Sequence, residues 1–161
     1  MIKRPYRLRE VAYAAGLTPG TLSSWFARGH VIMSPQKGDY ETSGSGHQRL
    51  FSFYRAVHIA TMAELARLGI FPALYTSQLA FSFSDLGTPE RPPAELFPTG
   101  RTWLVIRCID GKLEGAVENV FTGAEIDLFR DRGGRIATSA IVLDMNQLVA
   151  RVRSRLPKEN I

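Results

Sequence analysis

The chain has 161 residues, of which 45% are hydrophobic and 22% charged, a composition typical of a globular protein with one ample core or two small ones. No run approaches the ~18 apolar residues that cross a bilayer, and the basic first residues lack the apolar segment of a secretory signal. The net charge of +5 lies entirely in residues 1–70, which hold nine Lys and Arg against four Asp and Glu, whereas residues 71–161 hold eleven of each. A basic half beside a neutral half is typical of proteins that attract phosphate.

The first predicted elements are two short helices. Over residues 8–15, apolar side chains recur at i, i+3, i+4 and i+7, which is the spacing of one buried helix face. Gly16 can adopt the left-handed conformation that ends a helix. Thr18 is a good N-cap for a second helix, with Pro19 in its first turn and Gly29 at its end. The pattern predicts two helices joined by a tight turn.

A polar, glycine-rich stretch over residues 34–48 follows the two helices. It cannot bury a core, and its glycines favour turns. Short β segments at residues 31–33 and 49–51 would flank this stretch and turn it into a hairpin, the wing of a winged helix.

Two longer helices are expected next. Ser52 caps a helix over residues 53–68, which Gly69 ends, and a further helix runs from Pro72 to about residue 86. Residues 87–101 contain four prolines and are typical of a stiff connector or a domain boundary.

The second half favours β-structure. The expected elements are a strand over 102–109, a tight turn at Asp110-Gly111, a return strand over 112–121, a third strand over 135–143 and a final helix capped by Asp144. The predicted fold class is therefore α+β. The predicted domains are a DNA-binding domain over 1–70, a helix and proline-rich connector over 71–101, and a small domain of sheet and helix over 102–161.

The first 70 residues resemble the winged helix-turn-helix domain of the MerR family. The matching residues, in order, are Tyr6, Glu10-Val11-Ala12, Gly16-Leu17, Thr21-Leu22, Trp25, Gly29-His30-Val31, Arg49-Leu50-Phe51-Ser52 and Leu68-Gly69-Ile70. The resemblance implies binding to double-stranded DNA. Ser23 stands where members often carry an arginine, and the long dimerising helix and the metal-binding cysteines of some members are absent, so the resemblance implies neither metal sensing nor a particular dimer.

Candidate DNA-binding residues follow from the chemistry of the duplex. Cations and amide donors hold phosphates, whereas short polar side chains read base edges. We expect the second helix to supply the base contacts, and the resemblance puts Arg49 beside the phosphate backbone. Trp25, at helical spacing from Leu22, is expected in the core. The candidates are Arg7, Thr18, Gly20, Thr21, Ser23, Ser24, Arg28, Lys37, Tyr40, His47, Gln48 and Arg49, and a plain solvated helix surface is the alternative for the residues of the second helix.

Catalytic sites are not indicated. His30, His47 and His58 lack metal-ligand spacing to one another or to Cys108, and no glycine-rich nucleotide-binding motif occurs. The single cysteine excludes an internal disulfide and fits a reducing cytoplasm. We therefore expect no catalytic residue, no cofactor and no metal, and a cytoplasmic, nucleoid-associated protein.

The leading functional hypothesis is a bacterial or phage transcription regulator that binds a palindromic operator as a homodimer. Residues 102–161 would mediate self-association, or Trp103, Phe121 and Phe129 would line a ligand pocket. RNA polymerase is a further candidate partner. Two alternatives remain open. One is an architectural DNA-binding protein like phage excisionases and small terminase subunits, and the other is an interaction module that keeps the fold without binding DNA.

Overall fold

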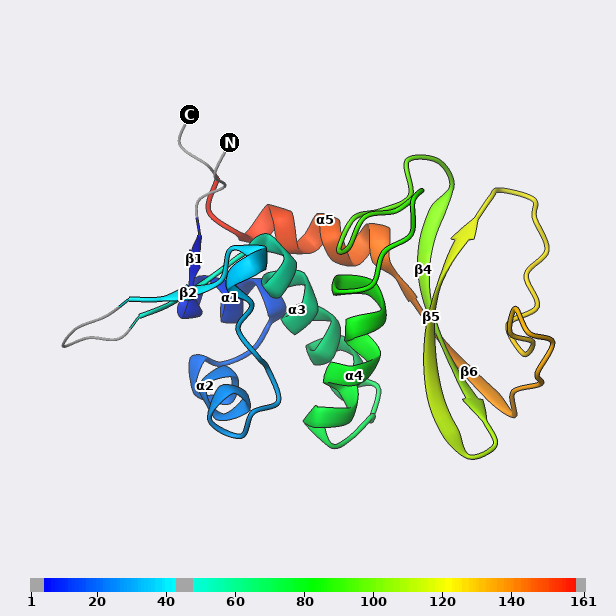
Figure 1. The fold of residues 1–161 in the computed structure, drawn as a ribbon, viewed down its shortest axis with the longest axis horizontal. Coiled ribbons are helices and arrows are strands. Elements are labelled where there is room, and N and C mark those ends of the chain that lie inside the picture. The colour runs from blue at the N-terminus through cyan, green and yellow to red at the C-terminus, as the bar shows by residue number, and fades with distance from the viewer. Residues whose placement is uncertain (1–4, 43–47, 159–161) are drawn as a thin grey trace.

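The computed structural model describes residues 5–42 and 48–158, and it has the mixed α+β character that the sequence predicts. The elements are β1 (Tyr6–Arg7), α1 (Leu8–Ala15), α2 (Pro19–Ala27), the 3₁₀ helix η1 (Pro35–Lys37), β2 (Tyr40–Glu41), β3 (Arg49–Phe51), α3 (Phe53–Arg67), α4 (Ala73–Ser84), β4 (Arg101–Ile109), β5 (Lys112–Val120), β6 (Ser139–Asp144) and α5 (Met145–Arg155). Figure 1 shows the helices grouped at one end of the molecule and the strands β4 to β6 at the other.

Helices α1 and α2 begin and end where the local sequence predicts. Gly16 ends α1 with a φ of 69°, in the left-handed region that favours glycine. The Thr18 side chain then accepts a hydrogen bond from the Thr21 backbone N–H at 3.1 Å, which caps α2, and Pro19 occupies the first turn. The two helices are therefore separated by a short turn set by local chemistry.

The hairpin forms later in the chain than expected. Strand β3 matches the predicted segment 49–51 and pairs with both β1 and β2, but residues 31–33 do not form a strand. The chain turns there instead, because the Ser34 backbone N–H donates to the Asp39 carboxylate at 2.9 Å and η1 follows. The hairpin strand that precedes β3 begins only at Tyr40.

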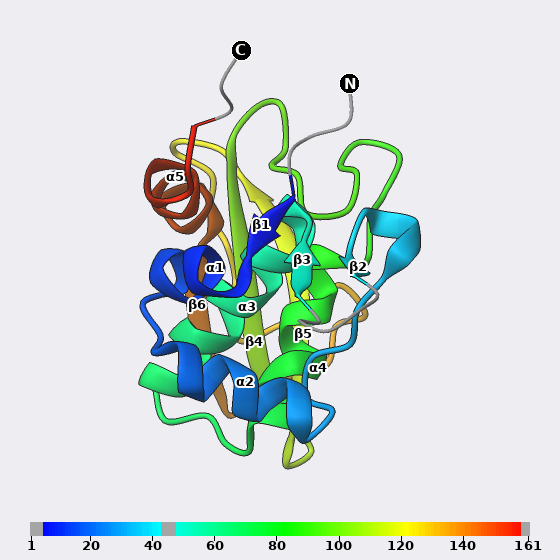
Figure 2. The same ribbon diagram turned by 90° about the vertical axis from the view of Figure 1, so that its left-hand side faces the viewer.

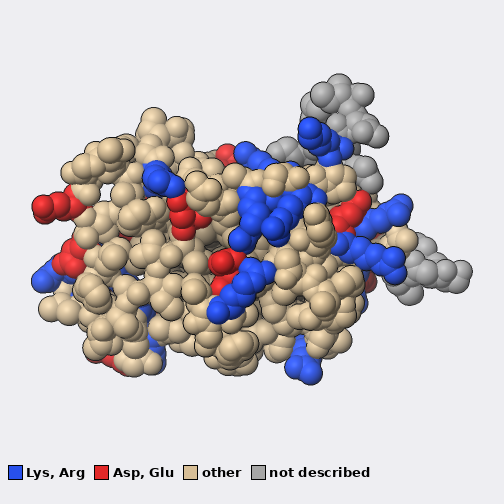
Figure 3. Space-filling view, turned by 180° about the vertical axis from the view of Figure 1, so that it is seen from behind, with Lys and Arg blue, Asp and Glu red and all other residues tan. Residues whose placement is uncertain are grey.

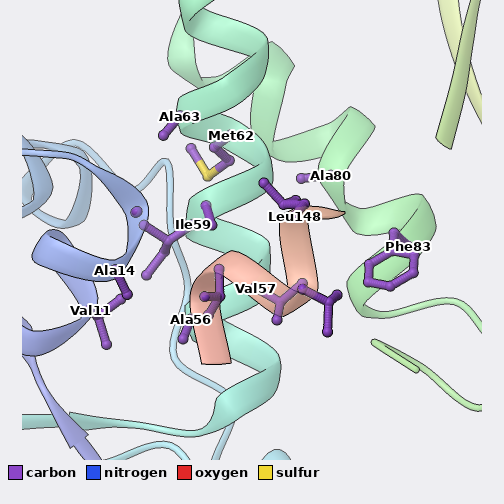
Figure 4. Close-up of a cluster of buried hydrophobic side chains, with 14 of the residues drawn as sticks. Val11, Ala14, Ala56, Val57, Ile59, Met62, Ala63, Ala80, Phe83 and Leu148 are labelled. Carbon is purple, nitrogen blue, oxygen red and sulfur yellow. The ribbon is translucent and has the colours of Figure 1, made fainter. Parts of the chain in front are cut away.

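Helix α3 is the centre of the helical end. Apolar side chains surround it, and it packs against α1, α4 and α5. Figure 4 shows side chains from these four helices meeting around α3: Val11, Ala14, Ala56, Val57, Ile59, Met62, Ala63, Ala80, Phe83 and Leu148. Because α3 is buried on several sides, it holds α1 and the hairpin in fixed positions.

The proline-rich segment 87–100 packs on the end of α4. Its buried Arg91 lies 5.1 Å above the Phe83 ring, and its guanidinium donates to the carbonyls of Phe83, Leu86, Pro92 and Glu95. Ala94 is also buried and donates its N–H to the Phe83 carbonyl at 2.9 Å. The segment is thus a fixed part of the structure.

Strands β4, β5 and β6 form an antiparallel sheet in the order β5-β4-β6. Asp110 and Gly111 both have positive φ, as the predicted two-residue turn requires. Strand β6 begins at Ser139, four residues later than expected. The backbone of Arg135 and Ile136 is engaged in a local turn with Arg130 and Asp131, so these residues do not pair with β4.

Helix α5 returns the chain to the helical end. Asp144 caps it, and Met145, Leu148, Val149, Val152 and Leu156 are buried, as the spacing predicts. These side chains join the same buried cluster as those of α1 and α3, and α5 packs directly on both helices. In Figures 1 and 2, α1 lies between α5 and α2.

Candidate nucleic-acid interface

The exposed surface of α2 carries short, uncharged side chains. Thr18, Gly20, Thr21 and Ser23 are exposed and Ser24 is half-buried, whereas Leu22 is fully buried. The Thr18 and Thr21 hydroxyls lie 2.9 Å apart and hydrogen-bond to each other. This surface can approach base edges closely, since its side chains are short, but it supplies no cation of its own.

An open groove of about 650 Å³ lies where the start of α1 meets α2 and strand β3. Its lining residues are Arg7, Leu8, Arg9, Glu10, Ser23, Gln48 and Arg49. The structure thus brings together four of the predicted site residues, Arg7, Ser23, Gln48 and Arg49, and adds Arg9. Figure 2 faces this side of the molecule, with α2 below and β3 beside α1.

Two cations of the groove are open to an external anion. Arg7 and Arg9 are exposed, and neither side chain forms an ion pair with another residue in the described ranges. The backbone N–H of Arg7 donates to the Glu10 carboxylate at 2.7 Å, which fixes the start of α1 and leaves the guanidinium unused. The groove therefore offers donors of the kind that hold phosphate.

Arg49 is held more firmly. Its Nε donates to the Glu41 carboxylate of the neighbouring strand at 2.6 Å, and its guanidinium lies 5.3 Å from the centre of the Phe26 ring. The Phe26 ring in turn packs at 5.2 Å on that of Phe51. Arg49 thus joins the hairpin to α2, and it also lines the groove.

The remaining predicted residues lie outside the groove. Lys37 donates to Asp85 at 2.6 Å, so its ammonium is engaged at the junction of η1 with the end of α4. Tyr40 is 46% exposed on β2, and Arg28 is exposed just after α2. His47 lies outside the described residues. Trp25 is half-buried and packs against the core, which agrees with its expected place.

A buried carboxylate that the sequence did not single out positions the hairpin. Asp39 is 1% exposed and accepts hydrogen bonds from the Ser34 and Ser52 backbone N–H groups, from the Ser52 hydroxyl at 2.8 Å and from Arg55 Nε at 3.1 Å. It therefore ties both ends of the hairpin to the first turn of α3. The only signal in the sequence is an acid just after Gly38 in a turn, which does not indicate burial.

The network continues beneath the hairpin to α4. Asp85 contacts Lys37, Arg55 and His58, and His58 bridges the Ser84 hydroxyl at 2.7 Å and the Ser77 hydroxyl at 3.0 Å. Burial opposes ionisation of Asp85, but hydrogen bonds from His58 and Lys37 outweigh it and hold its pKa well below the usual range. Burial lowers the pKa of His58, against the raising effect of Asp85.

His58 contacts both Ser77 and Asp85, as the histidine of a hydrolytic triad contacts its serine and its aspartate. The geometry here differs from that of such a triad. His58 Nδ1 lies 3.5 Å from Asp85, farther than from the Ser84 hydroxyl, and the imidazole is only 3% exposed. The Asp85 carboxylate is also shared with Lys37 and Arg55. In a triad the substrate reaches the serine Oγ, and the histidine beside it exchanges protons with the substrate and with solvent. The His58 imidazole is enclosed, so it does not have that access.

Other site classes find little support in the described residues. Within 5–42 and 48–158, no three His, Cys, Asp or Glu side chains gather in a way that could hold a metal ion. Phe121 and Phe129, named for a ligand pocket, are each about half exposed. None of the described helices is both long and apolar enough to span a membrane.

Comparison with known proteins gives no assignment. No protein-family model matches the chain, and a search of curated proteins finds no match. The function is therefore inferred from the geometry of the interface described above.

Proposed function

We propose that this protein binds double-stranded DNA through a MerR-like winged helix-turn-helix formed by its first 70 residues and acts as a transcription regulator. Helix α2 would enter the major groove, and the β2–β3 hairpin would serve as the wing. The element order of two capped helices, a hairpin and a long buried helix supports this proposal. The observation that carries it is the groove in which Arg7 and Arg9 meet Ser23, Gln48 and Arg49 beside α2.

The contacts divide by chemistry. Arg7, Arg9 and Arg49 would hold phosphates, because guanidinium groups bind phosphate oxygens in a sequence-independent way. Thr21, Ser23 and Ser24 would approach base edges, because short hydroxyl side chains can donate to or accept from several bases. With no cation on the exposed surface of α2, the affinity would come mainly from the groove.

The first experiment measures binding of the full chain to genomic DNA fragments across a salt series. Three phosphate contacts predict that log K falls against log salt with a slope of roughly −3 or steeper. A chain that fails to bind any fragment at low salt would refute the proposal and leave an interaction module as the better account.

A variant pair tests whether α2 faces the DNA. Thr21→Glu places a carboxylate at the third position of α2, where a glutamate favours the helix, so folding should persist. The same carboxylate would repel phosphates, and binding should fall at least tenfold. Thr122→Glu, on an exposed residue at the sheet end, is the matched control and should bind like the wild type.

We further propose a homodimer through residues 102–161. One DNA-binding domain binds a single half-site weakly, and two domains on a palindrome bind it with higher affinity. Sedimentation of the full chain, free and on DNA, gives the stoichiometry. Footprinting then separates the two DNA-binding roles. One protected palindrome near a promoter supports a regulator, whereas cooperative protection of clustered sites supports an architectural protein.

A further inference from the structure

The charges of the second half are divided along the chain. Residues 71–144 hold seven Lys and Arg against ten Asp and Glu, whereas residues 145–158, which are α5 and its continuation, hold four cations and no acid. The four are Arg151, Arg153, Arg155 and Lys158. The overall neutrality of the second half therefore hides one strongly basic segment.

In the fold, this basic segment lies at the same end of the molecule as α2. Helix α5 packs on α1 and α3, and its C-terminal end points toward the same side as α2 and the hairpin (Figure 1). A Cβ atom placed on Gly16 would lie 3.8 Å from Arg155 Nη1 and 2.6 Å from Arg67 Nη2. Both guanidinium groups therefore flank the turn that leads from α1 into Thr18 and α2.

The acids nearby do not neutralise this surface. Glu64 pairs with Arg67 at 2.7 Å and with Arg151 at 2.6 Å, so one carboxylate serves two cations. Arg67 also donates to the carbonyls at the end of α1. Arg155 and Lys158 are exposed and form no ion pair with any other residue in 5–42 or 48–158. Figure 3, seen from behind, shows Lys and Arg side chains gathered over this half of the molecule.

We propose that the C-terminal end of α5 is a second DNA-backbone contact, in which Arg155 and Lys158 hold phosphates beyond the N-terminus of α2. The inference rests on the proposed function and adds a second surface that contacts the DNA backbone. In Figure 2 the end of α5 lies on the far side of α1 from β3, so the two basic surfaces lie on either side of α1 and would hold the duplex at two separate places. This surface would add affinity without reading sequence, because guanidinium and ammonium groups meet phosphate alike at every base pair.

A purely structural role for these cations makes a different prediction. Cations in the last turn of a helix stabilise it through its dipole. If Arg155 served only the helix, its removal would lower the unfolding midpoint and leave the salt dependence of DNA binding unchanged.

The test uses the full chain and one duplex bound by the wild type. Arg155→Gln with Lys158→Gln should make the slope of log K against log salt shallower by roughly 1.8, since each lost contact removes about 0.9. Arg155→Lys with wild-type Lys158 keeps the charge and should keep the slope. Arg130→Gln with Arg132→Gln removes the same charge at the sheet end and is the matched control.

The outcomes separate the two proposals. A wild type that binds steeply, with an unchanged slope in the α5 variant, would overturn the second contact and leave the first standing. Equal loss in the α5 variant and the sheet-end control would also overturn it, because net charge alone would then explain the effect. A wild type that binds no DNA would refute the proposed function itself.

Discussion

The two ends of the molecule use their cations in different ways. At the sheet end, Arg107, Arg130, Arg132 and Arg135 each form an ion pair with a carboxylate on β5 or on the segment 121–138. The pairs of Arg132 and Arg135 with glutamates of β5 join that segment to the sheet. At the helical end, Arg7, Arg9, Arg28, Arg155 and Lys158 form no ion pair with a described residue. Most described cations of the sheet end are therefore paired within the fold. The helical end also pairs several of its cations, but it leaves these five available to an external anion.

The ends also differ in where they place their paired charges. The carboxylate of the buried pair at the helical end is fully enclosed, since the side chains of Arg55 and Asp39 are only 8% and 0% exposed. At the sheet end, Arg107 and Glu118 are 4% and 16% exposed, and the pair of Arg135 with Glu114 is open, at 53% and 44%. A buried pair that loses one member leaves a charge without compensation, while water readily replaces a lost exposed partner. The following changes test this difference.

The largest effect is expected from Asp39→Ala. It removes the acceptor of the Ser34, Ser52 and Arg55 hydrogen bonds and leaves the buried Arg55 guanidinium with the more distant Asp85 carboxylate at 3.9 Å. We expect the free energy of unfolding to fall by about 3–5 kcal/mol, measured by urea denaturation. Asp127→Ala, in an exposed pair of the sheet end, is the control. Equal losses in the two variants would show that the ends do not differ in this way.

The next effect concerns binding and compares the unpaired cations directly. Arg7→Gln with Arg9→Gln should make the salt slope shallower by roughly 1.8. The start of α1 should survive, because Glu10 accepts from the backbone N–H of Arg7. Combined with the α5 variant, the two losses should add, since the surfaces share no partner. A combined loss no greater than either single one would mean that only one surface meets DNA.

Local chemistry explains which parts of the fold could be predicted from the sequence. The Thr18 and Ser52 caps, the Gly16 stop and the Asp110-Gly111 turn each depend on a few neighbouring residues, and all are where the pattern predicts. The strand expected at 31–33 is wrong because the chain turns at Ser34, whose backbone N–H donates to the Asp39 carboxylate, a contact that the pattern of apolar residues does not contain.

The same reasoning applies to the candidate site. The pattern and the resemblance indicated Arg7, Ser23, Gln48 and Arg49, and the groove brings them together because β1 pairs with β3 and α1 packs on α2. It did not indicate that Lys37 pairs with Asp85 across 48 residues, or that Arg155 lies beside Gly16. Charge counted along the sequence assigned the basic character to the first half alone, whereas tertiary packing moves α5 to that end.

A smaller effect, set by pH, is expected beneath the helical end. Burial lowers the pKa of His58 below its ordinary value of 6.5, although Asp85 acts to raise it and Arg55 and Lys37 lower it further. As the pH falls through 6.5, the unfolded chain therefore binds this proton more readily than the folded chain does. The free energy of unfolding should fall as the pH drops from about 6.5, by at most about 1.4 kcal/mol per pH unit.

His58→Gln checks this assignment, because glutamine can still bond to the Ser77 and Ser84 hydroxyls but does not titrate. Urea denaturation between pH 5 and 7.5 should give a flatter profile for the variant than for the wild type. The other two histidines are present in both proteins, so an unchanged profile would assign the titration to them.

The smallest effect is expected from Arg135→Gln at the sheet end. The Arg135 guanidinium donates to both Glu114 oxygens, at 3.1 and 2.6 Å, and to Asp131 at 2.7 Å, and these bonds raise its pKa. The side chains of Arg135 and Glu114 are open to water, which can replace the lost bonds, so the urea midpoint should stay close to that of the wild type. The salt slope of DNA binding should also be unchanged, because this cation already has its anions within the protein. A shallower slope would mean that paired and unpaired cations contribute alike, and the difference between the two ends would then have no bearing on where DNA binds.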